Sequence, residues 1–132
     1  MTTPAEARSD ATQQLRDKIL AQPDLKTLLV EGLEEWPELV GSIFVRSLTA
    51  AERSSFERSM NFDPHGNPRN IENLQTRLAV LAMVAADGSR IFDEADVEAL
   101  AKKSASALQT IFNAAAELNG LSEQAVERAA KN

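Results

Sequence analysis

The sequence predicts a mainly α fold: a small helical domain with one N-terminal β-hairpin packed on it, or an α+β fold if the hairpin is counted. The run 78–86 is apolar on nearly every face and stops at Asp87-Gly88, which predicts a buried helix with other helices around it. Residues that start and stop helices recur through the C-terminal half. Two runs rich in β-branched and apolar residues near the N-terminus predict the hairpin.

Length and composition set the first bounds. The 132 residues fit one domain, expected at 11–132 after a flexible N-terminus at 1–10. The absence of cysteine excludes disulfides and thiolate chemistry. With no apolar signal-peptide core, and no apolar run near the ~20 residues of a membrane span, we expect a soluble, cytoplasmic protein without a membrane partner. The net charge of −6 argues against nucleic acid as a partner, because an acidic surface repels phosphates.

The N-terminal half should contain one short helix and the hairpin. Over 11–21, apolar residues recur on one face among polar ones, and the helix must end before Pro23. The runs 27–30 and 42–48 predict the two strands of a hairpin at 27–48. Two strands alone are marginal in water, so this hairpin must pack on the helices or on a partner.

The remaining residues, 49–132, should be helical. The predicted helices are 49–60, 70–85, 93–103, 105–118 and 122–130, and the proline- and glycine-rich stretch 61–68 should be an exposed loop. Their start signals are Thr49 with Glu52 (a capping box), Asn70, Asp93, Ser104 or Ser106, and Ser122. The predicted core consists of large apolar residues at helical spacing: Phe56, Leu74, Leu78, Leu81, Phe92, Val97, Leu100, Leu108, Ile111, Phe112, Leu118 and Val126.

No group of residues in the sequence indicates catalysis. His65 is the only histidine and lies in the loop without a cysteine or second histidine, so we expect an exposed side chain. The acids between 87 and 98 suggest calcium binding, but an EF-hand loop needs oxygen ligands where Met83 and Ala85 stand. No serine has a histidine neighbour, and no phosphate-binding glycine loop is present. The sequence therefore predicts no enzyme activity, no cofactor and no metal.

The hairpin holds the candidate partner-binding residues, Trp36, Phe44 and Arg46. Two interpretations of Trp36 stay open: it folds back onto the core, or it is an exposed anchor for a partner, since tryptophan is favoured at binding hot spots. Arg46 lies within a β-type run and should face outward, paired with Glu31 or Glu52.

A resemblance to a known family adds to these predictions. The segment 44–56, Phe-Val-Arg-Ser-Leu-Thr-Ala-Ala-Glu-Arg-Ser-Ser-Phe, resembles a strand and threonine-capped helix of the tail assembly chaperones of long-tailed, siphovirus-type bacteriophages. Downstream, Leu-Ala-Val-Leu at 78–81 and the stretch 86–100 that begins Ala-Asp-Gly-Ser-Arg-Ile-Phe-Asp are similar to the same family. So are Lys103-Ser104, Leu108, Phe112, 118–122 and the ending Ala-Lys-Asn. The resemblance covers roughly 19–132 and depends on the order and spacing of these motifs.

The resemblance implies a non-enzymatic assembly factor in the host bacterial cytoplasm that is absent from the mature virion. The implied partners are the phage tape measure protein and the tail tube protein, and self-association is a further hypothesis. Many members also have a longer form made by ribosomal frameshifting. Because 129–132 contain no helix stop, and adenine-rich codons can encode Lys131-Asn132, we expect a slippery run there. Two alternatives remain: an acidic helical adaptor or regulatory protein-binding module, and a divalent-ion-binding module that uses the acids after Asp87.

Overall fold

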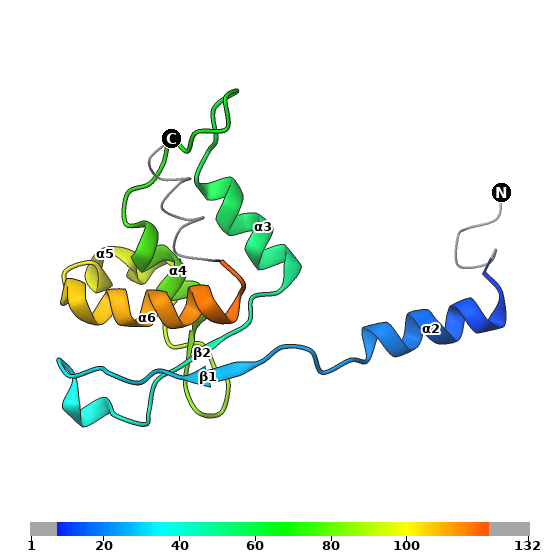
Figure 1. Ribbon diagram of the computed structural model, residues 1–132, viewed down its shortest axis with the longest axis horizontal. Coiled ribbons are helices and arrows are strands. Elements are labelled where there is room, and N and C mark those ends of the chain that lie inside the picture. The colour runs from blue at the N-terminus through cyan, green and yellow to red at the C-terminus, as the bar shows by residue number, and fades with distance from the viewer. Residues whose placement is uncertain (1–7, 122–132) are drawn as a thin grey trace.

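A computed structural model of the chain describes residues 8–121 (Figure 1). These residues form five α-helices and a small three-stranded antiparallel sheet, which confirms the predicted mainly helical α+β fold. In chain order the elements are α2 (Asp10–Leu20), β1 (Thr27–Leu29), the 3-10 turn η1 (Pro37–Leu39), β2 (Phe44–Arg46), α3 (Ala50–Ser59), α4 (Leu74–Ala82), β3 (Met83–Val84), the 3-10 turn η2 (Glu94–Asp96), α5 (Val97–Leu100) and α6 (Ala105–Leu118). The predicted helix at 122–130, with Ser122 and Val126, lies outside the described residues, as do residues 1–7 of the predicted flexible N-terminus.

The sheet has β2 in its centre, paired with β1 in the predicted hairpin and with β3 on its other edge. The third strand is a correction, because the sequence predicted one helix over 70–85. At Met83 the backbone becomes extended (φ −71°, ψ 128°), and Val84 pairs with Phe44. The strand satisfies backbone groups of β2 that a longer helix would leave unpaired, and this requirement outweighs the helical pattern of the run.

The start of α4 is a second correction, because Asn70 does not cap it. The side-chain amide of Asn70 instead donates to the carbonyl oxygen of Ser59 (3.0 Å). Asn73 occupies the N-cap position with a left-handed backbone (φ 54°) and no side-chain cap bond. Asparagine is among the few residues that tolerate this conformation. The residues before Leu74 are thus bonded to the end of α3, and the helix starts later than predicted.

Other predicted caps are confirmed. Thr49 and Glu52 form the reciprocal capping box of α3, and the Ser104 hydroxyl caps α6. Asp93 caps its element as predicted, but that element is the turn η2 followed by the single turn α5, and not one helix over 93–103. It is short because the chain becomes extended again at Ser104 (ψ 125°) to begin α6.

The core lies where α4 and α6 pack together and against the sheet. Six predicted core residues of the helical part are buried: Phe56, Leu78, Leu100, Leu108, Ile111 and Phe112. Five others are partly buried at the margin of this core: Leu74, Leu81, Phe92, Val97 and Leu118. The hairpin region also buries Val30, Leu33, Ile43, Val45 and Leu48, which the sequence prediction left out. They are buried because α6 lies over this region of the sheet (Figure 1).

The first helix, α2, extends away from this packed body (Figure 1). Its N-terminus is capped by Ser9, whose hydroxyl accepts a bond from the backbone N–H of Thr12 (3.2 Å). It ends at Leu20, before Pro23 as predicted. None of its residues is buried. Neither α2 nor any other helix of the described part of the chain is long and apolar enough to cross a membrane.

Candidate functional site

The main candidate site is an apolar groove of about 720 Å³ between the hairpin tip and the segment from β3 to α5. We call it the Trp36 groove. Its lining residues are Glu35, Trp36, Pro37, Glu38, Leu39, Ser42, Ile43, Met83, Ile91, Phe92, Leu100 and Lys103. Apolar side chains dominate this lining, and its charged side chains from the described part of the chain are two glutamates and one lysine.

The local backbone holds Trp36 in a half-buried position. The N–H of Trp36 donates to the carbonyl of the buried Leu33 (3.1 Å), and the N–H of Leu39 donates to the carbonyl of Trp36 (2.9 Å). Pro37 at the start of η1 favours this turn because its φ is fixed near the helical value. Trp36 packs against the core cluster and also lines the groove. Of the two interpretations that the sequence left open, the structure shows the contact with the core, and the role as an anchor for a partner stays a prediction.

The opposite wall of the groove is formed by Ile91 and Phe92. A tight turn after β3 positions them, with Gly88 at φ 86°, a left-handed conformation that glycine adopts without strain. The N–H of Ile91 then donates to the carbonyl of Met83 (3.3 Å). Ile91 is 40% exposed, and Leu39, on the hairpin side, is 44% exposed. Exposed apolar side chains gathered in one groove are typical of sites that bind another protein.

The charges at the groove are mainly negative. Glu35 and Glu38 stand on the hairpin side, and Lys103 is the one lysine or arginine of residues 8–121 in the lining. A hydrogen bond from the Ser106 side chain lowers the pKa of Glu35 below its ordinary value, which is itself well below neutral pH. The groove therefore complements an apolar surface that has cationic side chains beside it.

The predicted partner residue Arg46 lies outside this groove and is engaged within the chain. Its Nη1 donates to Oε1 of Glu52 (2.8 Å), and its Nη2 donates to Oε2 of Glu52 and to the carbonyl of Leu81 (2.8 Å). Of the two partners that the sequence suggested, Glu31 and Glu52, the structure shows Glu52. Arg46 thus joins β2 to α3 and to the end of α4.

Phe44 also lies on β2 and is half-buried, next to the fully buried Val45. The structure therefore does not bring the three predicted residues together, since only Trp36 lines the groove. Sequence reasoning missed Leu39 and Ile91. The one available signal was the position of each large apolar residue in a turn-rich segment, where exposure to solvent is common.

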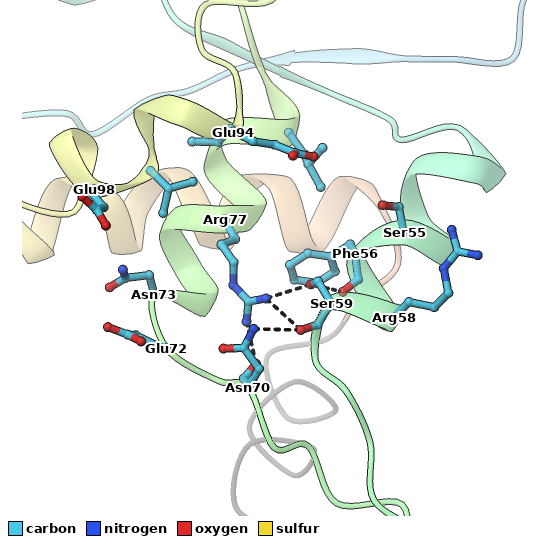
Figure 2. A pocket seen from close by; sticks show the side chains of 13 residues that line it. Ser55, Phe56, Arg58, Ser59, Asn70, Glu72, Asn73, Arg77, Glu94 and Glu98 are labelled. Atoms are coloured by element: carbon cyan, nitrogen blue, oxygen red, sulfur yellow. Dashed lines mark hydrogen bonds between the residues drawn. The ribbon is translucent and has the colours of Figure 1, made fainter.

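A second hollow of about 720 Å³, the Arg77 groove, lies between α3, α4 and the η2–α5 segment (Figure 2). Nη1 of Arg77 donates to Oγ of Ser59 (2.8 Å), and Nη2 donates to the carbonyl of Asn70 (2.7 Å). Burial lowers the pKa of Arg77, although a guanidinium stays protonated in proteins. Glu94 and Glu98 lie on the η2–α5 side of the groove. The arginine links the end of α3 to the segment before α4, which is a structural role.

The described residues that line the two grooves include no pairing of a serine with a histidine. Ser59 has no histidine neighbour in the lining of the Arg77 groove. His65 is exposed on the loop, where its backbone N–H donates to the carboxylate of Asp63 (2.8 Å). Over residues 8–121 no group of three or more metal-ligating side chains is present. Asp87 accepts bonds from the N–H and hydroxyl of Ser89 and so stabilises the turn after β3.

Comparisons with protein-family models, curated proteins and solved structures find no match. The Trp36 groove is therefore the structural starting point for a functional hypothesis. Its apolar lining, the exposed side chains of Leu39 and Ile91, and its mainly negative charge suit reversible, non-covalent binding.

Proposed function

We propose that this chain is a non-enzymatic tail assembly chaperone of a long-tailed bacteriophage. In this role it binds the tape measure protein in the host bacterial cytoplasm, helps to recruit tail tube subunits, and is absent from the mature virion. Two features support the proposal. The motifs at 44–56 and 78–100 resemble those of this family, and the Trp36 groove offers a surface suited to the task.

The observation that carries the proposal is the open apolar groove. A tape measure protein contains long helical segments, and an amphipathic helix presents apolar side chains along one stripe. Such a stripe aggregates unless another apolar surface covers it, and a hydrophobic groove is a common way to do so. Trp36 packs against the core cluster, so its side chain is held in place and can serve as the aromatic anchor. Glu35 and Glu38 favour client helices with lysine or arginine beside the stripe.

We expect Leu39→Asp to weaken binding of an amphipathic tape measure segment by at least about 10-fold. The substitution places a charge in the groove that the client helix must desolvate. Because Leu39 is 44% exposed, the fold should persist. Binding can be followed by the fluorescence of Trp36, the one tryptophan of the chain, and by co-purification.

Val40→Asp is the matched control, since Val40 is the next residue, is 72% exposed and does not line the groove. The affinity of Val40→Asp for the tape measure segment should stay within about twofold of that of the wild type.

Trp36→Ala should abolish co-purification with the tape measure segment while the helical circular dichroism persists. Undiminished binding by Leu39→Asp, or equal losses for Leu39→Asp and Val40→Asp, would contradict the proposed site.

A further inference from the structure

The helix α2 has an apolar face that the rest of the described chain does not cover. Leu15 and Ile19 are 59% and 60% exposed, and the helix has no buried residue. Residues four apart share a helix face, so Ala11, Leu15 and Ile19 form one stripe. A free helix of 11 residues is only marginally stable in water, because helices of this length depend on packing of their apolar face.

The charges of α2 are divided between its two sides. At 3.6 residues per turn, Arg16 and Lys18 flank the apolar stripe, whereas Asp10 and Asp17 lie on the opposite side. Arg16 also contacts Asp17 (3.0 Å), but both side chains are about half exposed or more, and such surface pairs are weak. The stripe is therefore an apolar surface with cationic flanks.

The Trp36 groove has the complementary features: an apolar lining, with Glu35 and Glu38 as its negative charges. We propose that α2 of one copy of this chain docks its stripe into the Trp36 groove of a second copy, and that the second copy returns the contact. Leu15 and Ile19 would enter the groove, and Arg16 and Lys18 would face its glutamates. One chain thus carries both halves of the interface.

The geometry favours a second copy over the chain's own groove. In Figure 1, α2 and the hairpin tip at η1 lie at opposite ends of the molecule, joined through β1. The connecting residues 21–26 reach at most about 20 Å when extended. To fill its own groove, α2 would have to reverse direction and run back along the hairpin. If two copies exchange α2, which we call the arm of each chain, they form a closed, two-fold symmetric dimer with two arm–groove contacts.

This inference goes beyond the proposed function and does not depend on it, because no client takes part. If the chain is a chaperone, the arm of a second copy covers the groove until a client helix replaces it. An exposed apolar groove would otherwise be prone to non-specific association.

The test is the molar mass of the full chain by size-exclusion chromatography with light scattering. We expect a dimer with micromolar dissociation, and a monomer for the double variant Leu15→Asp/Ile19→Asp. Compared at concentrations low enough for the wild type to be monomeric, the two proteins should have the same melting temperature, since α2 buries no residue within its own chain. Leu20→Asp is the matched control: Leu20 is 70% exposed and lies off the stripe, so the dimer should persist. Ile91→Asp, in the groove, should give a monomer with α2 unaltered.

Mixing the two kinds of monomer identifies the interface. The arm of Ile91→Asp is intact and the groove of Leu15→Asp/Ile19→Asp is intact. At concentrations well above those that dimerise the wild type, the mixture should therefore form a heterodimer through one arm–groove contact, while each variant alone stays monomeric. A wild type that is monomeric throughout would overturn the inference. So would an Ile91→Asp variant that stays dimeric, because α2 would then pair with another surface. Client binding is measured separately, so failure of either proposal is distinguishable from failure of the other.

Discussion

Phe112→Ala should lower the free energy of unfolding by about 3–5 kcal/mol. Phe112 is 3% exposed on the face of α6 that belongs to the core cluster. Removing the ring leaves a cavity that a close-packed core fills only partly. Because a small domain is stable by only about 5–15 kcal/mol, much of its stability would be lost.

Urea denaturation followed by circular dichroism measures this change. Phe62→Ala is the control, because Phe62 lies in the loop after α3 and is 41% exposed. The Phe62→Ala substitution should change the free energy of unfolding by no more than about 0.5 kcal/mol. If Phe112→Ala and Phe62→Ala had equal stabilities, the ring of Phe112 would not be in the core.

The helix that carries Phe112 was predictable because each of its boundaries is encoded locally. Ser104 caps its start through its own side chain, and Gly120, at φ 68°, follows its end. Its apolar face repeats at helical spacing, so neither its position nor its buried side depended on distant residues. The capping box at Thr49 was predictable for the same reason.

Features that depend on distant residues were not predictable. Met83 and Val84 lie in a run with helical composition and become a strand only because β2, far earlier in the chain, needs a partner on its free edge. Asn70 has the residue type of a cap, but its amide is bonded to Ser59 on α3. In both places tertiary bonding overrides a local preference.

The candidate site also has a part that the sequence could predict and a part that it could not. Trp36 could be singled out from its residue type and its place in the hairpin connection. The groove could not, because its far wall at Ile91 comes from a different part of the chain and reaches Trp36 only once β3 has joined the sheet. Pairing of Arg46 with Glu52 was one of the two pairings that the sequence predicted, and it is observed. The side chain of Arg46 is only 15% exposed, however, and does not face outward. Its bond to the carbonyl of Leu81 depends on tertiary structure and could not be predicted locally.

Arg46→Ala should lower the free energy of unfolding by about 2–3 kcal/mol. Arg46 and Glu52 have side chains that are only 15% and 25% exposed, so water screens their bonds less than those of surface pairs. The substitution would also leave the carbonyl of Leu81 without this donor. The exposed pair Arg53–Glu57 (3.2 Å) is the control, and Glu57→Gln should cost less than about 0.5 kcal/mol. Equal effects of Arg46→Ala and Glu57→Gln would contradict this role.

The same ion pair predicts how stability depends on pH. The hydrogen bond from Arg46 lowers the pKa of Glu52 from its ordinary 4.5 to about 2 in the folded state. The contribution of Glu52 to stability is therefore complete above about pH 4.5 and is lost as the pH falls towards about 2. After allowance for solvent screening it amounts to about 1–2 kcal/mol.

Glu52→Gln isolates this contribution, because it removes the charge and retains a side-chain oxygen for the N–H of Thr49. The lowered pKa values of Asp63 and Asp87 act on both proteins alike. We expect Glu52→Gln to be less stable than the wild type near neutral pH and to approach it as the pH falls to about 2–3. Unfolding free energies measured at a series of pH values would show this convergence. Parallel curves for the two proteins across that range would mean that Glu52 titrates alike in the folded and unfolded states, and that its bond with Arg46 adds nothing to stability.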